Sequence, residues 1–508
     1  MNQHVSRLKF NHFALFFLYC CLFSFPEFVI PQENSRSNPN NFVIAGHQAD
    51  RWYFGQNAGL DFRPDVPAVD LSNIILNVLT SPAIMADSSG EILFFTNGYR
   101  IYNRLGDTMP DGNGLHGFSG NPMPVLIVPK PGNEHIYYVF TTHRPRMNPN
   151  DVQTLYGLEY SEVNMNLNEG LGGLTFKNKV LLGPEISSKL SAVKHINGTD
   201  YWVVAHKFNS DEFCSFRVTS EGVDSTSYVS SHIGTFHAGP GEDNNAIGYM
   251  KLSPDGTKLA LAIYGSNLLE IFDFDHSTGK VMNSITSPAV FDEVYGIEFS
   301  PDSKYLYVTV TPIMLPVPNY TPASYLYQFD VGLGNQIFNP GSYQTIAMDT
   351  TGSYFAGMQL GTDGRIYISR SPYGNGSLSV IQNPARHGED CNFTSNAIDL
   401  QGRQCKYGLP NFIQSYFNLP HFNAIVSEVS ATVTFRLQNM HQIDSLIWDF
   451  DDPASDQNIS EEFVPEHVFS APGVYNVSVT EYFGGIAYGP YVVTVTVNFS
   501  DISENSRI

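Results

Sequence analysis

The chain has 508 residues, of which 15% are charged and 13% aromatic, with 42 glycines and a formal net charge of −22. Few charges with many aromatics and glycines are typical of an all-β protein, and they argue against a coiled coil or a disordered chain. The acidic balance argues against nucleic acid as a partner, because phosphate binding needs clustered Lys and Arg. The length allows two to four domains.

The first residues have the order of a secretory signal. Arg7 and Lys9 precede an apolar run, Phe13–Phe25, which ends at Pro26. This run is shorter than the roughly 20 apolar residues of a membrane-spanning helix. No other segment of the sequence could span a bilayer, so we expect no transmembrane helix in the mature chain.

Two adjacent cysteines, Cys20 and Cys21, also allow a lipid-anchored form of the protein. The bulky Tyr19 before them favours an ordinary signal peptide instead. We therefore predict a signal peptide over residues 1–30, a linker over residues 31–44, and export to the periplasm, the cell surface or the medium.

Six strand–turn–strand units recur along the middle of the chain. Each places a turn rich in Gly, Asn or Asp before a run of Ile, Leu, Val and Tyr, and such turns tolerate the positive φ of a tight hairpin. Their spacing of about 40–65 residues is close to that of propeller blades. The turns lie at Ser89-Gly90, Pro131-Gly132, Asn197-Gly198, Ser253–Gly256, Ser300–Ser303 and Gly361–Gly364.

This repeat predicts a β-propeller over residues 45–422. Seven blades are favoured, because Trp52–Gly55 paired with the late strand Phe412–Tyr416 would add a seventh unit to the six. Six or eight blades are the alternatives. Stacked sandwiches are a further alternative, but they give no reason for the recurring hairpin.

The pattern changes near residue 425 to that of a short β-sandwich. Val433 and Phe435 alternate with polar residues, as in a half-buried strand. Trp448 is expected to anchor the core between two sheets. We place this second domain at residues 425–498, followed by a polar tail over residues 499–508.

The motifs of this second domain resemble those of a PKD domain. The family's usual pattern is Trp-x-Phe-Gly-Asp, then His-x-Tyr, then Pro-Gly-x-Tyr-x-Val. Here the matching segments are Trp448–Pro453, His467–Tyr475 and Val477–Thr480. Asp451 replaces the usual Gly and Phe469 the usual Tyr, and both changes preserve the turn and the ring. The resemblance implies an Ig-like sandwich.

Upstream segments resemble exported Bacteroidetes proteins in which a propeller-like region of the WD or YVTN type precedes PKD domains. Such proteins are often associated with type IX secretion or gliding motility, so the resemblance implies export. The matching segments are Trp52–Phe62, Ile127–Gly132, Tyr160–Asn166, Lys189–His195, Gly248–Gly256 and Tyr407–Phe417.

Three acidic side chains and two cysteines are the candidate site residues. Asp449, Asp451 and Asp452 offer oxygen ligands that would suit Ca²⁺, although an acidic turn at a strand end is the favoured explanation, because a Ca²⁺ site needs about six or more oxygens. In an exported protein Cys391 and Cys405 would close a small loop by a disulfide, and two reduced thiols are the alternative. Apart from calcium we expect no cofactor.

The sequence carries no local signature of an enzyme. It lacks His-Glu-x-x-His, Gly-x-Ser-x-Gly and Gly-x-x-x-x-Gly-Lys runs. We therefore expect a non-catalytic binding or adhesion protein, whose propeller presents a face to a surface protein or polysaccharide and whose second domain is a spacer or contact module. A propeller enzyme acting on a glycan or lactone and a structural envelope component are the alternatives.

Overall fold

The computed structural model describes residues 47–64, 66–72, 76–117, 120–143, 156–237, 243–312, 323–371, 375–418, 422–426, 432–437, 443–483 and 485–497. The predicted signal peptide, linker and polar tail lie outside these residues. Every regular element within them is a β-strand or a short 3-10 helix, which confirms the all-β prediction. None of the helices in these ranges is long and apolar enough to cross a membrane.

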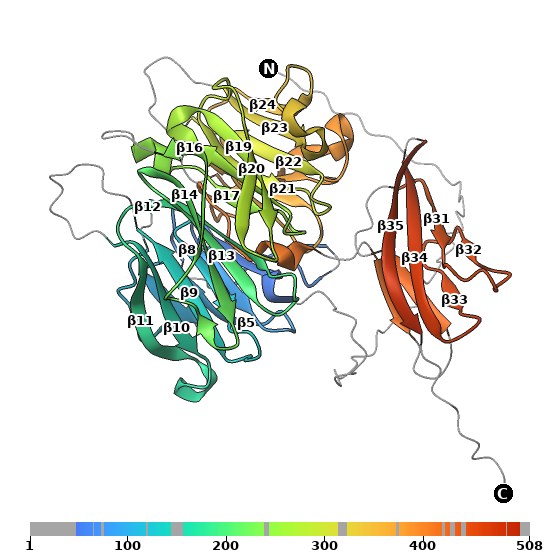
Figure 1. Ribbon diagram of the computed structural model, residues 1–508, viewed down its shortest axis with the longest axis horizontal. Coiled ribbons are helices and arrows are strands. Elements are labelled where there is room, and N and C mark those ends of the chain that lie inside the picture. Colours follow the sequence, from blue (N-terminus) through green and yellow to red (C-terminus); the bar gives the residue numbers. More distant parts are fainter. Residues whose placement is uncertain are drawn as a thin grey trace, which may run out of the picture. The chain divides into compact units, whose positions relative to one another are not determined.

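Seven antiparallel sheets follow one another along the first part of the described chain (Figure 1). The N-terminal sheet has three strands, β1 (Arg51–Phe54), β2 (Ala58–Asp61) and β3 (Ala68–Val69). The second comprises β4 (Ala83–Ala86), β5 (Ile92–Thr96), β6 (Arg100–Asn103) and β7 (Thr108–Asn113). The third comprises β8 (Val125–Pro129), β9 (Ile136–Thr142), β10 (Leu158–Asn164) and β11 (Gly173–Leu182).

The fourth sheet is larger, because β16 (Val229–His237) joins it by pairing with β14. Its other strands are β12 (Ile186–Lys194), β13 (Tyr201–Lys207), β14 (Ser210–Thr219) and β15 (Gly222–Val223). The fifth comprises β17 (Met250–Leu252), β18 (Lys258–Ile263), β19 (Leu268–Asp275) and β20 (Lys280–Thr286).

The last two sheets of this series each have four strands in chain order. The sixth comprises β21 (Val294–Phe299), β22 (Tyr305–Val310), β23 (Ser324–Asp330) and β24 (Tyr343–Asp349). The seventh comprises β25 (Tyr354–Leu360), β26 (Ile366–Ser371), β27 (Ser377–Ile381) and β28 (Phe393–Asp399). The short helices are η1 (His47–Ala49), η2 (Asn168–Gly170), η3 (Asp243–Ala246), η4 (Tyr264–Ser266), η5 (Val331–Gln336), η6 (Gly388–Cys391) and η7 (Gln414–Phe417).

The six predicted turns each join the first and second strands of a sheet, as the repeat indicated. In the turn after β17, the Ser253 hydroxyl donates to Asp255 Oδ1 (2.5 Å) and accepts from the amide of Lys258 (2.9 Å). Ser300 makes the same two bonds after β21, to Asp302 (2.6 Å) and from Tyr305 (2.9 Å). The recurring Ser-Pro-Asp segment therefore closes a hairpin through its own side chains.

The sheets are arranged in the manner of a propeller. The first strand of each sheet from β4 onward contacts the first strand of the next, through β8, β12, β17, β21 and β25. Strands that meet in this order surround a common axis, and the outer strands of each sheet lie further from it.

Residues 404–411 close the series. Gln56 and Gln404 exchange backbone hydrogen bonds (2.7 and 3.3 Å), and the Tyr407 amide donates to Leu79 O (3.0 Å). The Tyr407 carbonyl accepts from the Gly357 amide of β25 (2.9 Å). This segment thus connects the N-terminal sheet, the stretch that leads into β4, and the seventh sheet.

The predicted pairing of Trp52–Gly55 with Phe412–Tyr416 is wrong. β1 pairs with β2, and Gln414–Phe417 forms η7. Phe412 meets the N-terminal sheet through its ring, which lies 6.1 Å from that of Trp52. The apolar character of this segment therefore serves packing, and the backbone closure uses the residues just before it.

The C-terminal part forms two facing sheets. One has the order β29 (Phe422–Val426), β30 (Thr432–Leu437), β33 (Glu466–Val468), and the other the order β32 (Ile459–Ser460), β31 (Ser445–Asp449), β34 (Gly473–Phe483), β35 (Ile486–Val497). Trp448 is fully buried between them, its ring 4.8 Å from that of Phe422 and its indole N–H bonded to Glu462 O. The predicted role of Trp448 as core anchor is confirmed.

Candidate functional site

The predicted disulfide between Cys391 and Cys405 is absent, and both thiols are fully buried. Cys391, in η6, and Cys405 are both free and belong to the same apolar cluster. Cys405 Sγ lies 3.3 Å from the carbonyl of Asn375 and 3.2 Å from that of Ser377, so it has hydrogen-bond partners of its own. Burial raises the pKa of each thiol to about 11. The two cysteines therefore act as small core residues.

The three acids proposed for calcium do not meet at one point. Asp449 accepts from Asn458 Nδ2 (2.9 Å), Asp451 from the Asn476 amide (2.9 Å), and Asp452 from Ser470. In the described part of the chain, no group of three or more His, Cys, Asp or Glu side chains is arranged to hold a metal ion. Calcium binding at these residues stays a prediction, which thermal unfolding of the protein with and without Ca²⁺ would test.

The axis around which the first strands meet is filled by side chains from several sheets. Tyr249 is 1% exposed, and its hydroxyl lies 2.7 Å from Ser81 Oγ, while its ring packs 5.4 Å from that of Tyr295. At another level Lys251 of β17 lies 3.0 Å from Glu298 of β21 and donates to Gln359 of β25 (2.6 Å). The acid placed there is thus neutralised by a lysine.

A pocket of about 680 Å³ opens instead between the N-terminal sheet and the second sheet. Arg51 and Tyr53 of β1 and Ser72 line one side. The other side comes from the second sheet, in which the β4–β5 and β6–β7 turns lie at the same end because successive strands are antiparallel. These two turns supply Asp87, Glu91, Arg104, Leu105 and Gly106.

The alternation of β1 explains how the pocket gains its charged wall. Side chains of successive strand residues point to opposite faces. Trp52 packs toward the seventh sheet, with its ring 5.4 Å from that of Tyr367. Arg51 and Tyr53 consequently face the second sheet, where the Tyr53 ring meets Phe95 edge-on at 5.2 Å.

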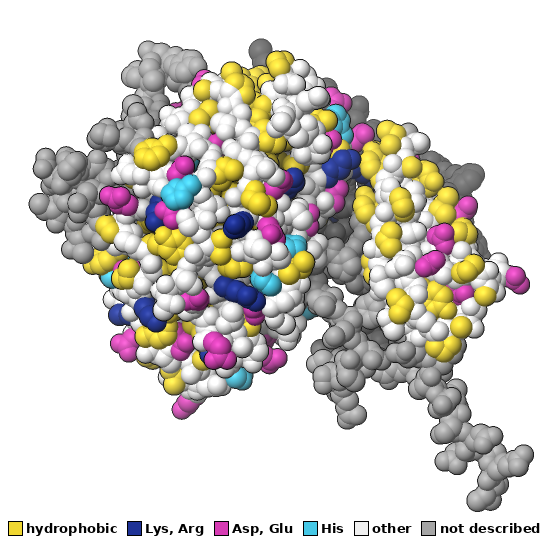
Figure 2. Space-filling view, in the orientation of Figure 1, with side chains coloured by type: hydrophobic (Ala, Val, Ile, Leu, Met, Phe, Trp, Pro, Cys, Tyr) yellow, Lys and Arg dark blue, Asp and Glu magenta, His cyan; other side chains and the backbone are white. Residues whose placement is uncertain are grey.

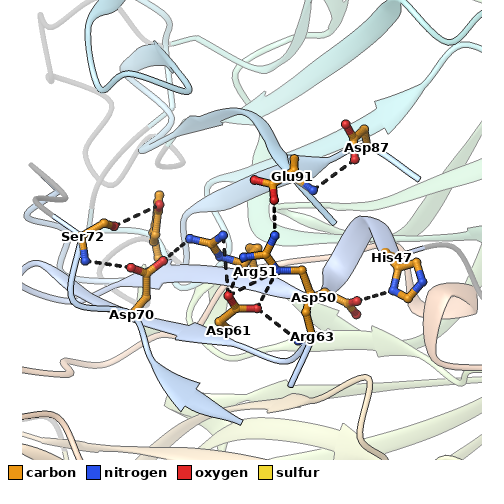
Figure 3. A network of polar contacts seen from close by, with 10 residues as sticks. His47, Asp50, Arg51, Asp61, Arg63, Asp70, Ser72, Asp87 and Glu91 are labelled. Carbon is orange, nitrogen blue, oxygen red and sulfur yellow. Dashed lines mark hydrogen bonds and ion pairs between the residues drawn. The ribbon is translucent and has the colours of Figure 1, made fainter. Parts of the chain in front are cut away.

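Ion pairs hold the side chains around the pocket in place (Figure 3). The Arg51 guanidinium is bonded to Asp70 and lies 3.7 Å from Asp61. Arg63 donates to both oxygens of Asp61 (2.7–3.2 Å) and reaches across to Glu91 of the second sheet. A continuous network of alternating charge therefore connects the two sheets.

The electrostatic environment keeps these acids ionised. Burial by itself would raise the pKa of Asp61, but hydrogen bonds from Arg63 and the charge of Arg51 outweigh it and hold that pKa below its ordinary value. Asp70 behaves in the same way, with burial opposed by hydrogen bonds from Ser72 and Arg51. Burial raises the pKa of Tyr53, so its hydroxyl stays protonated.

Sequence reasoning did not find this pocket. Its charged residues come from three separate places in the chain, β1, the β4–β5 turn and the β6–β7 turn, and no local motif connects Arg51 with Asp87 or Arg104. The only available signal is the run Asp87–Glu91, whose two acids flank a hairpin turn. The ion pairs that bring the sheets together form between residues up to 28 positions apart, such as Arg63 and Glu91.

The visible surface is mixed in charge. Figure 2 shows Lys and Arg side chains interspersed with Asp and Glu on this face, without a continuous basic patch. The arrangement fits the acidic composition of the chain, with 27 basic against 49 acidic residues.

Comparisons with known proteins give only distant likenesses. No protein-family model and no curated protein matches the chain. Among solved structures, a candidate 6-phosphogluconolactonase from Bacteroides fragilis is similar with 12% identity, over 83% of this chain and 94% of that chain, at a TM-score of 0.37. The hydrazine synthase of Kuenenia stuttgartiensis is similar with 13% identity, over 73% and 99%, at a TM-score of 0.38. A β-propeller domain of Cps50 (Swd1) from Myceliophthora thermophila is similar with 11% identity, over 64% and 94%, at a TM-score of 0.34. The strand pairing and the contacts between first strands define the fold of this chain.

Proposed function

We propose that this chain is an exported, non-catalytic binding protein of a Bacteroidetes bacterium. Its seven sheets are the blades of a seven-bladed propeller, and its C-terminal sandwich is a PKD domain that acts as a spacer or contact module. The propeller binds a polysaccharide or protein of the cell surface. Residues 1–30 direct export, and the remainder works outside the cytoplasm.

The observation that carries this proposal is the polar pocket between the N-terminal and second sheets. Its side chains are held by ion pairs before any ligand arrives, so binding costs little further ordering of Arg51 or Glu91. A pocket of this size lies within the usual range of small-molecule sites.

The filled axis argues against the enzyme alternative. A propeller hydrolase or lactonase would need converging acids or a metal where the first strands meet. Among the described residues of the first strands, the acid is Glu298, and Lys251 Nζ lies 3.0 Å from its carboxylate. Tyr249 fills a neighbouring level of the same axis.

A paired binding and turnover assay tests the proposal. The full exported chain is immobilised and screened against a glycan array and against purified envelope proteins. The same chain is incubated with soluble glycans and aldonolactones, with release of reducing ends and ring opening as readouts. We expect binding without turnover. Turnover, or no binding to either class of surface molecule, would contradict the proposal.

A further inference from the structure

We infer that the pocket between β1–β3 and β4–β7 takes an uncharged saccharide and discriminates against acidic polysaccharides. This inference rests on the proposed binding function and specifies the ligand of the same site. It follows from the charge balance, the hydrogen-bonding groups and the apolar surface of the pocket.

The charges that line the pocket cancel. Arg51 and Arg104 contribute two positive charges, and Asp87 and Glu91 contribute two negative charges. A charged ligand of either sign would therefore meet attraction and repulsion that offset each other, while it would still lose the hydration of its own charge. A neutral ligand has no such charge to desolvate, so the lining favours an uncharged molecule.

The same groups offer both donors and acceptors. Arg104 donates through NH1 to Gly170 O (2.6 Å), and its guanidinium carries four further N–H bonds. Asp87 accepts from the amides of Ser89 and Glu91 through Oδ1 alone, and Glu91 bonds Arg63 through Oε1 alone. Within the described part of the chain, the second oxygen of each carboxylate is left to accept. Sugar hydroxyls, which donate and accept at once, match such a mixed set.

The pocket also has apolar surface beside its charges. Leu93 and Leu105 line it together with the polar groups, and Leu105 is 67% exposed at its rim, whereas Phe95 is buried. The C–H faces of a pyranose ring pack on surfaces of this kind, while its hydroxyls reach the charged groups. A simple polar solute without an apolar face would leave this surface in water.

The charge of the whole chain acts in the same direction at longer range. A net charge of −22 repels polyanions as they approach, and this repulsion is screened by salt. An uncharged glycan feels neither the repulsion nor its screening. Salt dependence therefore separates the two ligand classes experimentally.

The test measures affinity of the full exported chain for two sets of probes by calorimetry. The neutral set contains cello-, malto-, xylo- and manno-oligosaccharides, and the acidic set contains oligogalacturonate and heparin oligosaccharides. The pocket variants are Arg104→Ala and Glu91→Gln, because both side chains lie at exposed turns and their replacement leaves the core intact. Arg436→Ala, at an exposed position of the C-terminal sandwich, is the matched control.

We expect a neutral oligosaccharide to bind, with an affinity that is unchanged from about 50 to about 500 mM NaCl. Each pocket variant should weaken binding roughly tenfold or more, since each removes a hydrogen bond to a charged group, and Arg436→Ala should not. Binding of the acidic probes alone would overturn the inference. The inference would also fail if Arg104→Ala and Glu91→Gln bound the neutral probe with the affinity of the parent and unfolded like the parent. In that case the proposed binding function would stand. If no saccharide binds, the inference fails, and the envelope-protein arm above decides whether the function survives.

Discussion

Replacing Lys251 by Met would leave the Glu298 carboxylate buried without its counter-charge. The two side chains are 1% and 0% exposed, with Nζ and Oε2 3.0 Å apart. At an effective dielectric constant of about 20, two unit charges at this distance attract by about 5 to 6 kcal/mol. Removing one partner of a buried pair costs about 3–5 kcal/mol, so we expect Lys251→Met to lower the free energy of unfolding of the propeller by that amount at pH 7.

The loss should depend on pH in a defined direction. Burial raises the pKa of Glu298 even beside Lys251, and removing the lysine raises it further. The folded variant then holds a proton that the unfolded chain releases above about pH 4, so its stability falls as the pH rises from there toward the folded-state pKa. The deficit relative to the parent should be smallest near pH 4 and largest at neutral pH.

Urea unfolding followed by tryptophan fluorescence measures this effect. Trp52 and Trp202 lie in the propeller and Trp448 in the sandwich, so a Trp448→Phe background reports the propeller alone. Lys251→Met/Glu298→Gln provides the matched control, because it removes both charges and should recover part of the loss. A variant Lys251→Met within about 1 kcal/mol of the parent at pH 7 would refute the reasoning.

Three further outcomes are expected. Asp452→Ala should destabilise the sandwich by about 1–3 kcal/mol, because the carboxylate accepts from Ser470 and lies 3.1 Å from His467. Those hydrogen bonds outweigh burial and hold the Asp452 pKa below its ordinary value. The loss of stability relative to the parent should therefore be present above about pH 4 and vanish as the pH falls through the folded-state pKa. Trp448 fluorescence would report it. Gly357→Ala should lower the melting temperature, because the added Cβ would lie 2.2 Å from the Tyr249 hydroxyl. Gly183→Ala is the control and should leave the melting temperature unchanged, because a Cβ there meets no atom within 4 Å. Equal melting temperatures for the two variants would count against a tightly filled axis. Alkylation and mass spectrometry of the denatured, unreduced protein should find both Cys391 and Cys405 modified. Detection of a disulfide-linked peptide that contains both residues would instead support the predicted disulfide.

Local turn chemistry made the repeat visible in the sequence. Ser253–Gly256 and Ser300–Ser303 specify hairpins through bonds between neighbouring residues, so their position could be predicted without any tertiary information. The burial of Val433 and Phe435 and the anchoring role of Trp448 were predictable for a similar reason. In a half-buried strand every second residue is apolar, and neighbouring residues of the sequence show this alternation directly.

The closure and the pocket depend on contacts that local patterns do not encode. Gln404 binds Gln56 through backbone atoms, which any residue carries, and residues 404–411 show no strand-like alternation. The disulfide prediction was wrong because the spacing of two cysteines in a loop does not reveal where their side chains point. The Cys405 thiol lies instead beside the carbonyls of Asn375 and Ser377. Arg51 and Arg104 line the same pocket only because two sheets lie side by side.

The closure by residues 404–411 also determines where mechanical load would act. The chain enters the propeller near β1, where Gln56 is bonded to Gln404, and leaves it just after η7. The exit is attached elsewhere, because the Asn411 side chain donates to Val125 O and Leu190 O, and the Ser415 hydroxyl accepts from the Lys194 amide. Tension applied at the N-terminal end would therefore load the N-terminal sheet first, whereas tension applied at the C-terminal end would load the third and fourth sheets. A force that pulls the two ends apart would be shared between several blades instead of acting on one.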